Sequence, residues 1–305
     1  MASGDSQGHP NGYGWWTKRI TYNQAYILLE QMERLFFILE QCHNLQTFVI
    51  SSEQPLPPLY HTDLTQILES RFSHSLRRLQ NHAQSVPFID CTEVIPSVNG
   101  LKSLGLRPEC MTPVDGPFKP SFECITSLTI FLPYTRDTLL PRWVFPSLQN
   151  LSLWNVTPNH TFLAPFVKEH QTTLRHLDVI TGYMGGRELS NILSNTPHLR
   201  SLAIPKSEIH ALESWIRMQS GSNRVMDKVL LPKLSHLGFR FDGMPRDYSC
   251  GWGLECLEKI LECEPFPELK VVRLLDTDAH RTVRQCNWED IKQQCLKYGV
   301  QFEYM

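Results

Sequence analysis

Hydrophobic residues recur along this chain in a short phrase with the spacing L-x-x-L-x-L. The clearest copies lie in the middle of the sequence, where they begin at Leu148, Leu174 and Leu199. These three starting points are 26 and 25 residues apart. Apolar and polar residues that alternate over a few positions are typical of a strand with one buried face. The pattern therefore predicts a series of short strands, each of which opens a unit of similar length.

Less regular copies extend this series in both directions. The nine phrases begin at Leu45, Leu76, Leu101, Ile125, Leu148, Leu174, Leu199, Leu234 and Leu269. The second phrase ends on the polar residue Asn81, so we expect that unit to be irregular. Such self-similarity is the signature of a leucine-rich repeat, in which each unit adds one strand and one return segment to a solenoid. The sequence thus predicts an α/β fold, an irregular leucine-rich-repeat solenoid with a curved parallel sheet and with helices and loops on its convex side.

Apolar residues spaced by three and four predict helices between the strands. A stripe from Tyr22 to Gln41 predicts a helix that caps the first repeat. Return helices are expected near residues 62–72, 162–167, 189–193, 212–216, 254–261 and 287–296. The final residues, VQFEYM, alternate and predict an edge strand. We therefore expect a flexible tail over residues 1–14, a capping-helix region over 15–44 and a leucine-rich-repeat domain over 45–305.

Composition and charge narrow the class of protein. Hydrophobic residues make up 41% of the chain and charged residues 20%, which is typical of a folded globular protein. A formal net charge of -2 provides no general attraction to nucleic acid or to an anionic membrane. The first residues, MASGDSQGHPNGYG, lack the basic start and apolar run of a secretory signal. We expect an intracellular protein, in the cytoplasm or nucleus, with no nucleic-acid or membrane partner.

The cysteines favour neither a disulfide framework nor a zinc knuckle. Their number is nine, which is odd, and no two of them form C-x-x-C. Cys256 and Cys263 lie seven residues apart on one predicted helix, where core positions are expected. We therefore predict reduced, mostly buried cysteines and no cofactor or metal.

One repeat resembles a known family. The segment LAPFVKEHQTTLRHLDV is similar to the repeat unit of fungal-type F-box/leucine-rich-repeat proteins. The matching residues are Phe166, His170, Thr173, Leu174, Arg175, Leu177 and Val179. The resemblance covers roughly Leu45 to Met305, and it implies that the repeats recognise a protein substrate of a ubiquitin ligase. For His170, at a helix end, we expect a bond to a local carbonyl and not a metal.

In that family an F-box docks on the Skp adaptor of a cullin ubiquitin ligase. Residues 1–44 show neither the Leu-Pro start nor the Ile/Leu/Trp spacing of an F-box. Two alternatives follow. Either the full product carries an F-box and binds the Skp adaptor and cullin, or the chain is a stand-alone leucine-rich-repeat adaptor or scaffold with no link to ubiquitin.

The residues between the leucines are predicted to line the concave face, because successive strand residues point to opposite sides of a sheet. Aligned in register, they form three rows across the strands. The first row is Ser103, Ser127, Asn150, His176, Ser201 and His236. The second row is Gly105, Thr129, Ser152, Asp178, Ala203, Gly238 and Arg273. The third row is Arg107, Phe131, Trp154, Ile180, Pro205 and Arg240.

The third row is the predicted contact surface for a protein partner. It places four apolar side chains between two arginines, on a face that is otherwise polar. Exposed aromatic and aliphatic residues in such a setting are typical of interaction hot spots. The alternative is that the row lies at the strand ends and packs beneath its own loops. His176 and Asp178, at the centre of the face, complete the predicted partner-binding set.

An enzymatic interpretation of the same face starts from His176, Asp178 and Ser201. Sheet geometry places Ser201 about 5 Å from His176, and Asp178 about 7 Å along the same strand. A flat sheet face, however, offers no nucleophile turn and no ring of amide donors for an oxyanion. We therefore expect a binding protein and not an enzyme.

Overall fold

Each of the nine leucine phrases forms a strand, from β2 to β10. The computed structural model describes residues 17–24, 29–52, 59–81, 98–107, 121–132, 143–158, 160–220, 231–240, 251–262, 266–275 and 288–304. The chain divides into two compact units. The N-terminal unit comprises Met1–Pro133 and Thr138–Leu148, and the C-terminal unit comprises Tyr134–Asp137 and Gln149–Met305.

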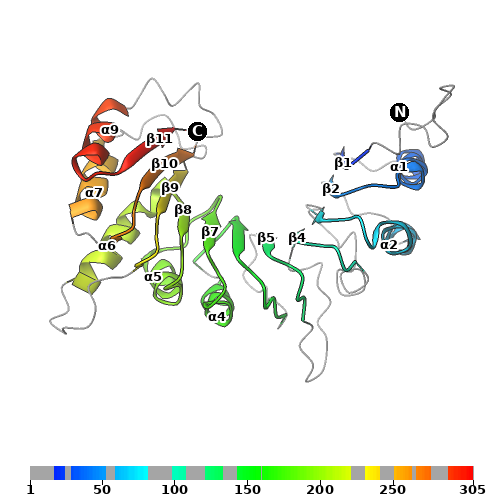
Figure 1. The fold of residues 1–305 in the computed structure, drawn as a ribbon, viewed down its shortest axis with the longest axis horizontal. Coiled ribbons are helices and arrows are strands. Elements are labelled where there is room, and N and C mark those ends of the chain that lie inside the picture. The colour runs from blue at the N-terminus through cyan, green and yellow to red at the C-terminus, as the bar shows by residue number, and fades with distance from the viewer. Residues whose placement is uncertain are drawn as a thin grey trace. The chain divides into compact units, whose positions relative to one another are not determined.

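In its described residues, the N-terminal unit contains five parallel strands that pair in sequence order. They are β1 (Arg19–Gln24), β2 (Thr47–Ser52), β3 (Arg78–Asn81), β4 (Ser103–Leu106) and β5 (Ser127–Phe131). Its helices are α1 (Leu29–Gln41) and α2 (Leu59–Phe72). Both helices lie on the same side of their strands (Figure 1). One strand followed by one return helix is the predicted repeat unit.

The start of the array differs from the prediction of a helix over Tyr22 to Gln41. Residues Arg19–Gln24 form strand β1, and the helix begins only at Leu29. The strand pairs with β2 along its whole length, and Lys18 O accepts hydrogen bonds from Gln46 N at 2.8 Å and Thr47 N at 2.9 Å. An unpaired edge of β2 would leave such groups without partners. Pairing across the sheet therefore outweighs the helical spacing of the local sequence.

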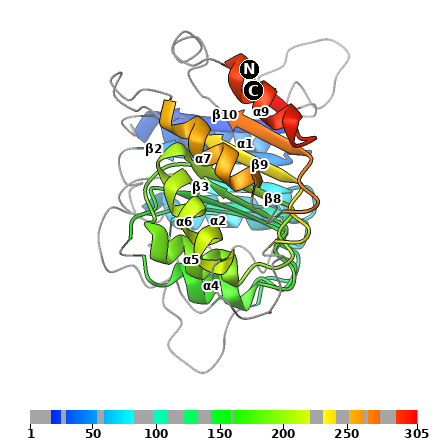
Figure 2. The same cartoon turned by 90° about the vertical axis from the view of Figure 1, so that its left-hand side faces the viewer.

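The part of the C-terminal unit that the structure describes contains six parallel strands, again in sequence order. They are β6 (Asn150–Trp154), β7 (His176–Val179), β8 (Ser201–Pro205), β9 (His236–Arg240), β10 (Val271–Leu275) and β11 (Gln301–Tyr304). Its helices are α4 (Leu163–Glu169), α5 (Gly186–Ser194), η3 (Lys206–Glu208), α6 (Ile209–Ser220), α7 (Gly251–Glu262) and α9 (Trp288–Lys297). Helices α4 to α7 form a layer beside the strands (Figure 2), in which each helix packs against the next. The predicted final edge strand is present as β11, whereas the predicted cap Asn287 lies outside the described residues.

The core of each unit lies between its strands and its helices. The apolar residues of the phrases fill it, and those of the C-terminal unit include Leu151, Leu153, Leu177, Val179, Leu202, Ile204, Leu237, Phe239, Val272 and Leu274, all buried. Burying one such side chain contributes about 1.5–3 kcal/mol. Their strand neighbours remain partly exposed in β6, where the burial alternates residue by residue. The polar rows therefore lie on the open face, opposite the helices.

Carboxylates tie two repeats of the C-terminal unit to the repeat that follows each of them. Glu188 Oε1, on α5, accepts a hydrogen bond from Ala164 N at 3.2 Å. One repeat later, buried Glu208 uses Oε1 to accept hydrogen bonds from Met184 N and from Gly185 N. Burial raises the pKa of both carboxyl groups, and the bonds from backbone N–H groups oppose that rise.

A close backbone approach joins the turns after β6 and β7. Val156 and Gly182 form a parallel bridge, and Gly182 has φ +112°. A Cβ atom at Gly182 would lie 2.1 Å from the carbonyl oxygen of Val156, so only glycine fits. Thr181 Oγ1 donates to Asn155 Oδ1 at 3.0 Å beside this bridge. The turns of adjacent repeats are thus locked at one separation.

The described residues agree with two further expectations. Four cysteines lie among them, all free thiols, of which Cys42, Cys256 and Cys295 are buried and Cys124 is exposed. The predicted bond between His170 and a local carbonyl is also confirmed, since its Nδ1 lies 2.8 Å from the carbonyl oxygen of Phe166. A carbonyl accepts, so Nδ1 carries the proton. Among the described residues no helix combines the length and the apolar character needed to cross a bilayer.

Candidate functional site

The strand register brings the predicted rows together. In the first row, Asn150, His176, Ser201 and His236 are successive pairing partners on β6 to β9. The second row runs through Ser152, Asp178, Ala203, Gly238 and Arg273 on β6 to β10. In the N-terminal unit, Ser103 pairs with Ser127 and Gly105 with Thr129. The alignment of the phrases therefore predicted the register in both units.

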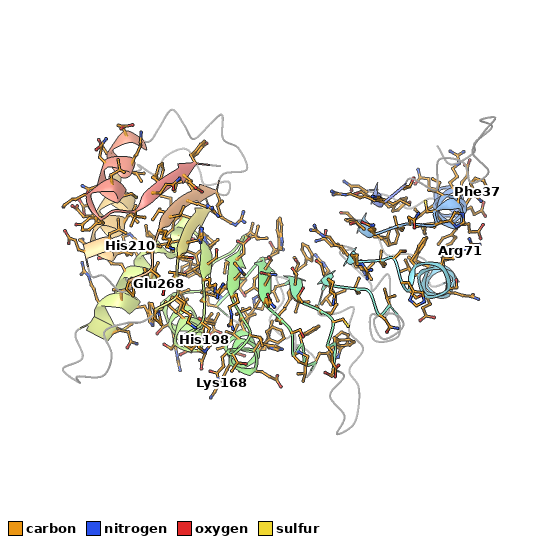
Figure 3. The ribbon with its side chains drawn as sticks, viewed as in Figure 1. Phe37, Arg71, Lys168, His198, His210 and Glu268 are labelled. Atoms are coloured by element: carbon orange, nitrogen blue, oxygen red, sulfur yellow. The ribbon has the colours of Figure 1, made fainter. Side chains whose placement is uncertain are left out.

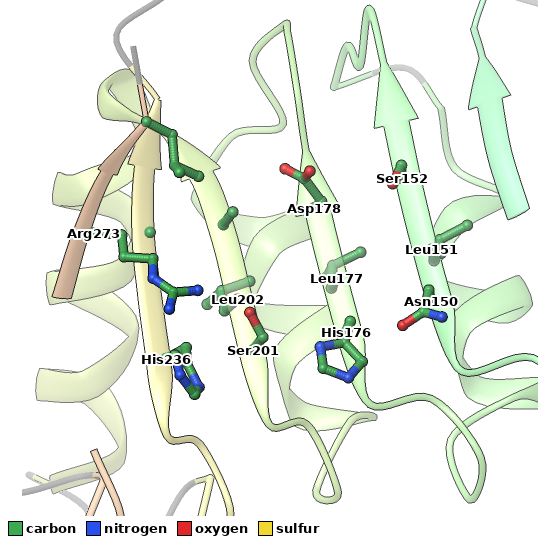
Figure 4. Close-up of a pocket in the computed structure, with 13 residues that line it drawn as sticks. Asn150, Leu151, Ser152, His176, Leu177, Asp178, Ser201, Leu202, His236 and Arg273 are labelled. Atoms are coloured by element: carbon green, nitrogen blue, oxygen red, sulfur yellow. The ribbon is translucent and has the colours of Figure 1, made fainter. Parts of the chain in front are cut away.

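A hollow of about 280 Å³ lies on the open face of the C-terminal unit, over β6 to β10 (Figure 4). The residues that line it are Asn150, Leu151, Ser152, His176, Leu177, Asp178, Ser201, Leu202, Ala203, His236, Gly238, Arg273 and Leu275. Two of the smallest side chains, Ala203 and Gly238, are neighbours in the second row. A Cβ atom added to Gly238 would contact Leu275 Cδ1 at 3.0 Å and Ala203 Cβ at 3.2 Å. The hollow exists because these two positions lack bulk.

One ion pair crosses the sheet beside the hollow. Arg240 Nε donates to Asp178 Oδ1 at 2.8 Å, and Arg240 Nη2 donates to Asp178 Oδ2 at 2.7 Å. The two residues lie on β9 and β7, so the guanidinium reaches over β8. Ala203 is the residue paired with Asp178 on β8, and its methyl group leaves this path open. Such a bidentate pair holds both side chains in one orientation.

This pair bears directly on the enzymatic interpretation. Ser201 and His176 are register neighbours, as expected. Asp178, however, directs both carboxylate oxygens to Arg240. In a serine triad the acid must instead hold the histidine ring in the reactive tautomer. Because Arg240 binds both of its oxygens, Asp178 does not orient the ring of His176 as a triad acid would.

Positively charged side chains surround the end of the hollow that lies at the N-terminal ends of the strands. Burial is the main cause that lowers the pKa of His176, followed by the nearby charges of His236, Arg200 and Arg175. For His236, burial again comes first, and Arg273 adds to the lowering. Each histidine is thus in a positive field that disfavours a further positive charge. The same field attracts an anionic group of a ligand.

Glu303 offsets part of this charge. Arg273 Nε donates to Glu303 Oε2 at 2.6 Å, and this carboxylate raises the pKa of His236 against the larger lowering effects. Ser235 Oγ lies 2.8 Å from His236 Nδ1 and also donates to Arg200 O at 3.1 Å. These contacts hold the ring of His236 in place at the start of β9, where it lines the hollow.

The predicted third row falls partly in each unit. Arg107 and Phe131 belong to the N-terminal unit, where Arg107 is half-buried and Phe131 is only 8% exposed. In the C-terminal unit, Trp154 and Ile180 are half-buried while Pro205 is buried. Arg240, the last member, pairs in register with Pro205. The apolar side chains of the row that reach solvent beside the hollow are therefore Trp154 and Ile180.

Sequence reasoning named both Asp178 and Arg240 but missed their ion pair. The alignment placed them in different rows, two strands apart, whereas the bond runs diagonally. The signal that could have revealed it is the succession of Ala203 and Gly238 in the second row. Ala203 lies between the carboxylate and the arginine, and Gly238 precedes Arg240 on its own strand, so both leave room for the longer side chain to lie across the sheet.

Comparison with known proteins establishes the fold. No protein-family model and no curated protein sequence matches the chain. Among solved structures, the chain is similar to the leucine-rich repeat-containing protein LegL7 from Legionella pneumophila, with 13% identity, a TM-score of 0.55 and 95% of each chain covered. This is a leucine-rich-repeat fold.

Two other solved structures superpose less closely. The complex of TLR13 with ssRNA13 gives 14% identity and a TM-score of 0.41, over 85% of this chain and 35% of that one. The complex of Rad7 and Elc1 in yeast gives 16% identity and a TM-score of 0.35, over 81% and 68%.

Proposed function

We propose that this chain is a protein-interaction module whose C-terminal unit binds a segment of a partner protein in the hollow over β6 to β10. The observation that carries the proposal is the hollow itself, with charged and hydroxyl groups beside the half-exposed Trp154 and Ile180. Aromatic anchors next to polar groups are typical of binding hot spots. The proposed activity is recognition, without a chemical step.

The size and charge of the hollow favour a particular kind of segment. A volume of about 280 Å³ lies below the ~300–1,000 Å³ of small-molecule sites, so it suits one or two side chains of a peptide. Arg200, Arg175 and the histidines favour an acidic side chain at the strand entry. Trp154 and Ile180 favour an apolar side chain at the opposite end of the strands. We therefore infer a partner segment that carries an acidic residue near an aliphatic or aromatic one.

Binding of peptides displayed from a library tests this proposal. Wild-type chain should select sequences of that composition, and Trp154→Ala or Arg200→Glu should weaken the selected peptides at least tenfold, which corresponds to about 1.4 kcal/mol or more. Met218→Ala and Lys168→Glu are matched controls on exposed helical positions. Peptides that bind all variants equally would contradict the proposal.

A finer role is also proposed, namely substrate recognition within an F-box-type ubiquitin ligase. The resemblance of residues 163–179 to the repeats of fungal-type F-box proteins supports it. The alternative is an adaptor or scaffold without a ubiquitin link, which would use the same hollow. Purification of the full product from cells separates the two, because only the ligase component brings the Skp adaptor and a cullin with it. Their absence from that preparation would leave the adaptor role.

A further inference from the structure

The helical layer of the C-terminal unit contains a cluster of metal-ligand side chains. His210 and Glu213 project from α6, and Cys256 projects from α7. Their ligand atoms all lie within 4.8 Å of one another. Figure 3 labels His210 in this layer, on the helical side of the unit. The cluster is therefore separate from the hollow on the open face.

Helix geometry explains the convergence. His210 and Glu213 are three residues apart, so they lie on the same face of α6. Helix α7 packs against that face of the layer and supplies the third group. His210 Nδ1 lies 3.2 Å from Cys256 Sγ and 3.8 Å from Glu213 Oε2. An imidazole nitrogen, a carboxylate oxygen and a thiol sulfur thus face a common point.

These separations can be compared with those of a zinc site. Zinc binds sulfur at about 2.3 Å and nitrogen or oxygen at about 2.0–2.2 Å in a tetrahedron, which separates neighbouring ligand atoms by about 3.3–3.6 Å. The observed 3.2 and 3.8 Å lie close to that interval on either side. A bound ion would draw all three ligand atoms, which now lie within 4.8 Å of one another, to that spacing. The mixed nitrogen, oxygen and sulfur donors favour zinc over magnesium or calcium, which prefer oxygen alone.

Two cations orient the carboxylate. Arg217 Nη2 lies 2.6 Å from Glu213 Oε1, and Lys259 Nζ lies 3.8 Å from the same oxygen. Glu213 Oε2 is the oxygen that faces His210. Outer partners of this kind fix the direction of a metal ligand. Because they are positively charged, they also weaken the attraction to a cation, so we expect micromolar affinity.

Access to the cluster comes from one side. The side chain of His210 is 58% exposed, whereas Glu213 is 11% and Cys256 only 3% exposed. An ion can therefore enter past the imidazole and meet the thiol on the inner side. Burial, with the nearby Glu213, raises the pKa of Cys256 to about 12, so binding of an ion must displace the thiol proton.

We propose that His210, Glu213 and Cys256 form a three-ligand zinc site that joins α6 to α7, with the fourth position open to water. The site links two consecutive repeats on the side of the molecule opposite the hollow. It is independent of the proposed recognition function, because none of its residues lines the hollow.

Cobalt titration of the full chain tests the site, since a thiolate bound to Co²⁺ gives a charge-transfer absorption. We expect one equivalent of Co²⁺ to produce this band, and Zn²⁺ to displace it with tighter binding. His210→Ala and Cys256→Ser should each weaken binding at least tenfold. His198→Ala and Cys124→Ser change an imidazole and an exposed thiol elsewhere, and they should leave the titration unchanged.

His210→Ala is the decisive variant, because its position is exposed and the substitution leaves the core intact. Circular dichroism checks that each variant is folded. Absence of the band in wild-type chain would overturn the proposal, and so would a band that persists unchanged in His210→Ala. In either case the contact between Cys256 and His210 is a simple hydrogen bond. Peptide binding in the presence of a chelator shows separately whether the recognition function holds.

Discussion

Asp178 and Arg240 form a bidentate ion pair across strand β8, although 62 residues of sequence separate them. The pair fixes one boundary of the hollow and joins β7 to β9 through side chains alone. Its side chains are 28% and 18% exposed, for Asp178 and Arg240 respectively, so water screens it only in part.

A double-mutant cycle on this pair should give a measurable coupling. Asp178→Asn and Arg240→Met each remove the ionic bond, and we expect a coupling of about 1 kcal/mol in the free energy of unfolding in urea. Glu30 and Arg34 provide the control, because their side chains are both 73% exposed and should couple only weakly. Equal coupling in the two cycles would mean that the crossing pair contributes no more than a surface pair.

Filling the hollow should abolish partner binding without unfolding the chain. Ala203→Phe adds a ring at the centre of the second row, where the described structure leaves space above β8. Thr129→Phe adds a ring to the same row in the N-terminal unit, outside the hollow, and serves as control. Fluorescence anisotropy with a selected peptide should show loss of binding for the first variant alone. Retained binding by Ala203→Phe would place the partner elsewhere.

The binding of an acidic partner segment should strengthen as the pH falls. His176 and His236 have lowered pKa values, so both are neutral at pH 7. A bound carboxylate favours their charged forms, so proton uptake accompanies binding below the ordinary histidine pKa of about 6.5. We expect tighter binding at pH 5.5 than at pH 7.5 in calorimetry, and a smaller difference in a His176→Asn, His236→Asn variant. A pH profile that is the same for both proteins would contradict this role.

The stability of the unliganded chain should change in the opposite sense. The lowered pKa values of His170, His176 and His236 mean that the unfolded chain binds more protons just below pH 6.5. The free energy of unfolding therefore falls as the pH drops from 6.5 through the folded pKa values. Urea midpoints measured from pH 7.5 to 5 should show this decline. His170→Gln should flatten it, while Met218→Ala, at an exposed position without a titratable group, should not.

Glu208→Ala should destabilise the C-terminal unit more than Glu188→Ala. The first substitution leaves two backbone N–H groups, of Met184 and Gly185, without their acceptor, and the cost is about 2–3 kcal/mol. The second removes one bond at a half-buried site, with a cost of about 1 kcal/mol. Thermal unfolding by calorimetry measures both. Equal losses of stability in the two variants would mean that the buried Glu208 contributes no more than the half-buried Glu188.

The strands and the rows were predictable because they depend on local alternation. Leucines at Leu177 and Leu202 must be buried, so His176 and Ser201 are forced to the other face and into the same row. Strand β1 was missed because its pairing with β2 is a long-range effect that the local spacing does not contain. The sequence around Tyr22 fits a helix equally well.

The cluster of His210, Glu213 and Cys256 could not be predicted from the sequence pattern, for a different reason. Cys256 was assigned to the core, and it is buried, but its contact with His210 depends on how α6 and α7 pack. The leucine phrases do not define how α6 and α7 are rotated about their axes. Strand register propagates through backbone bonds, whereas helix packing depends on the shapes of individual side chains.

Glu188 and Glu208 each bind backbone N–H groups of the preceding repeat. These bonds determine which segments of the chain could be exchanged as intact repeats. A segment cut at the leucine phrases would lose the acceptor for its own turn, because Glu208 lies in the repeat that begins at Leu199 while Met184 and Gly185 lie in the repeat that begins at Leu174. A graft that keeps the turn intact must therefore extend into the following helix. The unit that is complete in its hydrogen bonds therefore has different boundaries from the repeat defined by the leucine phrases.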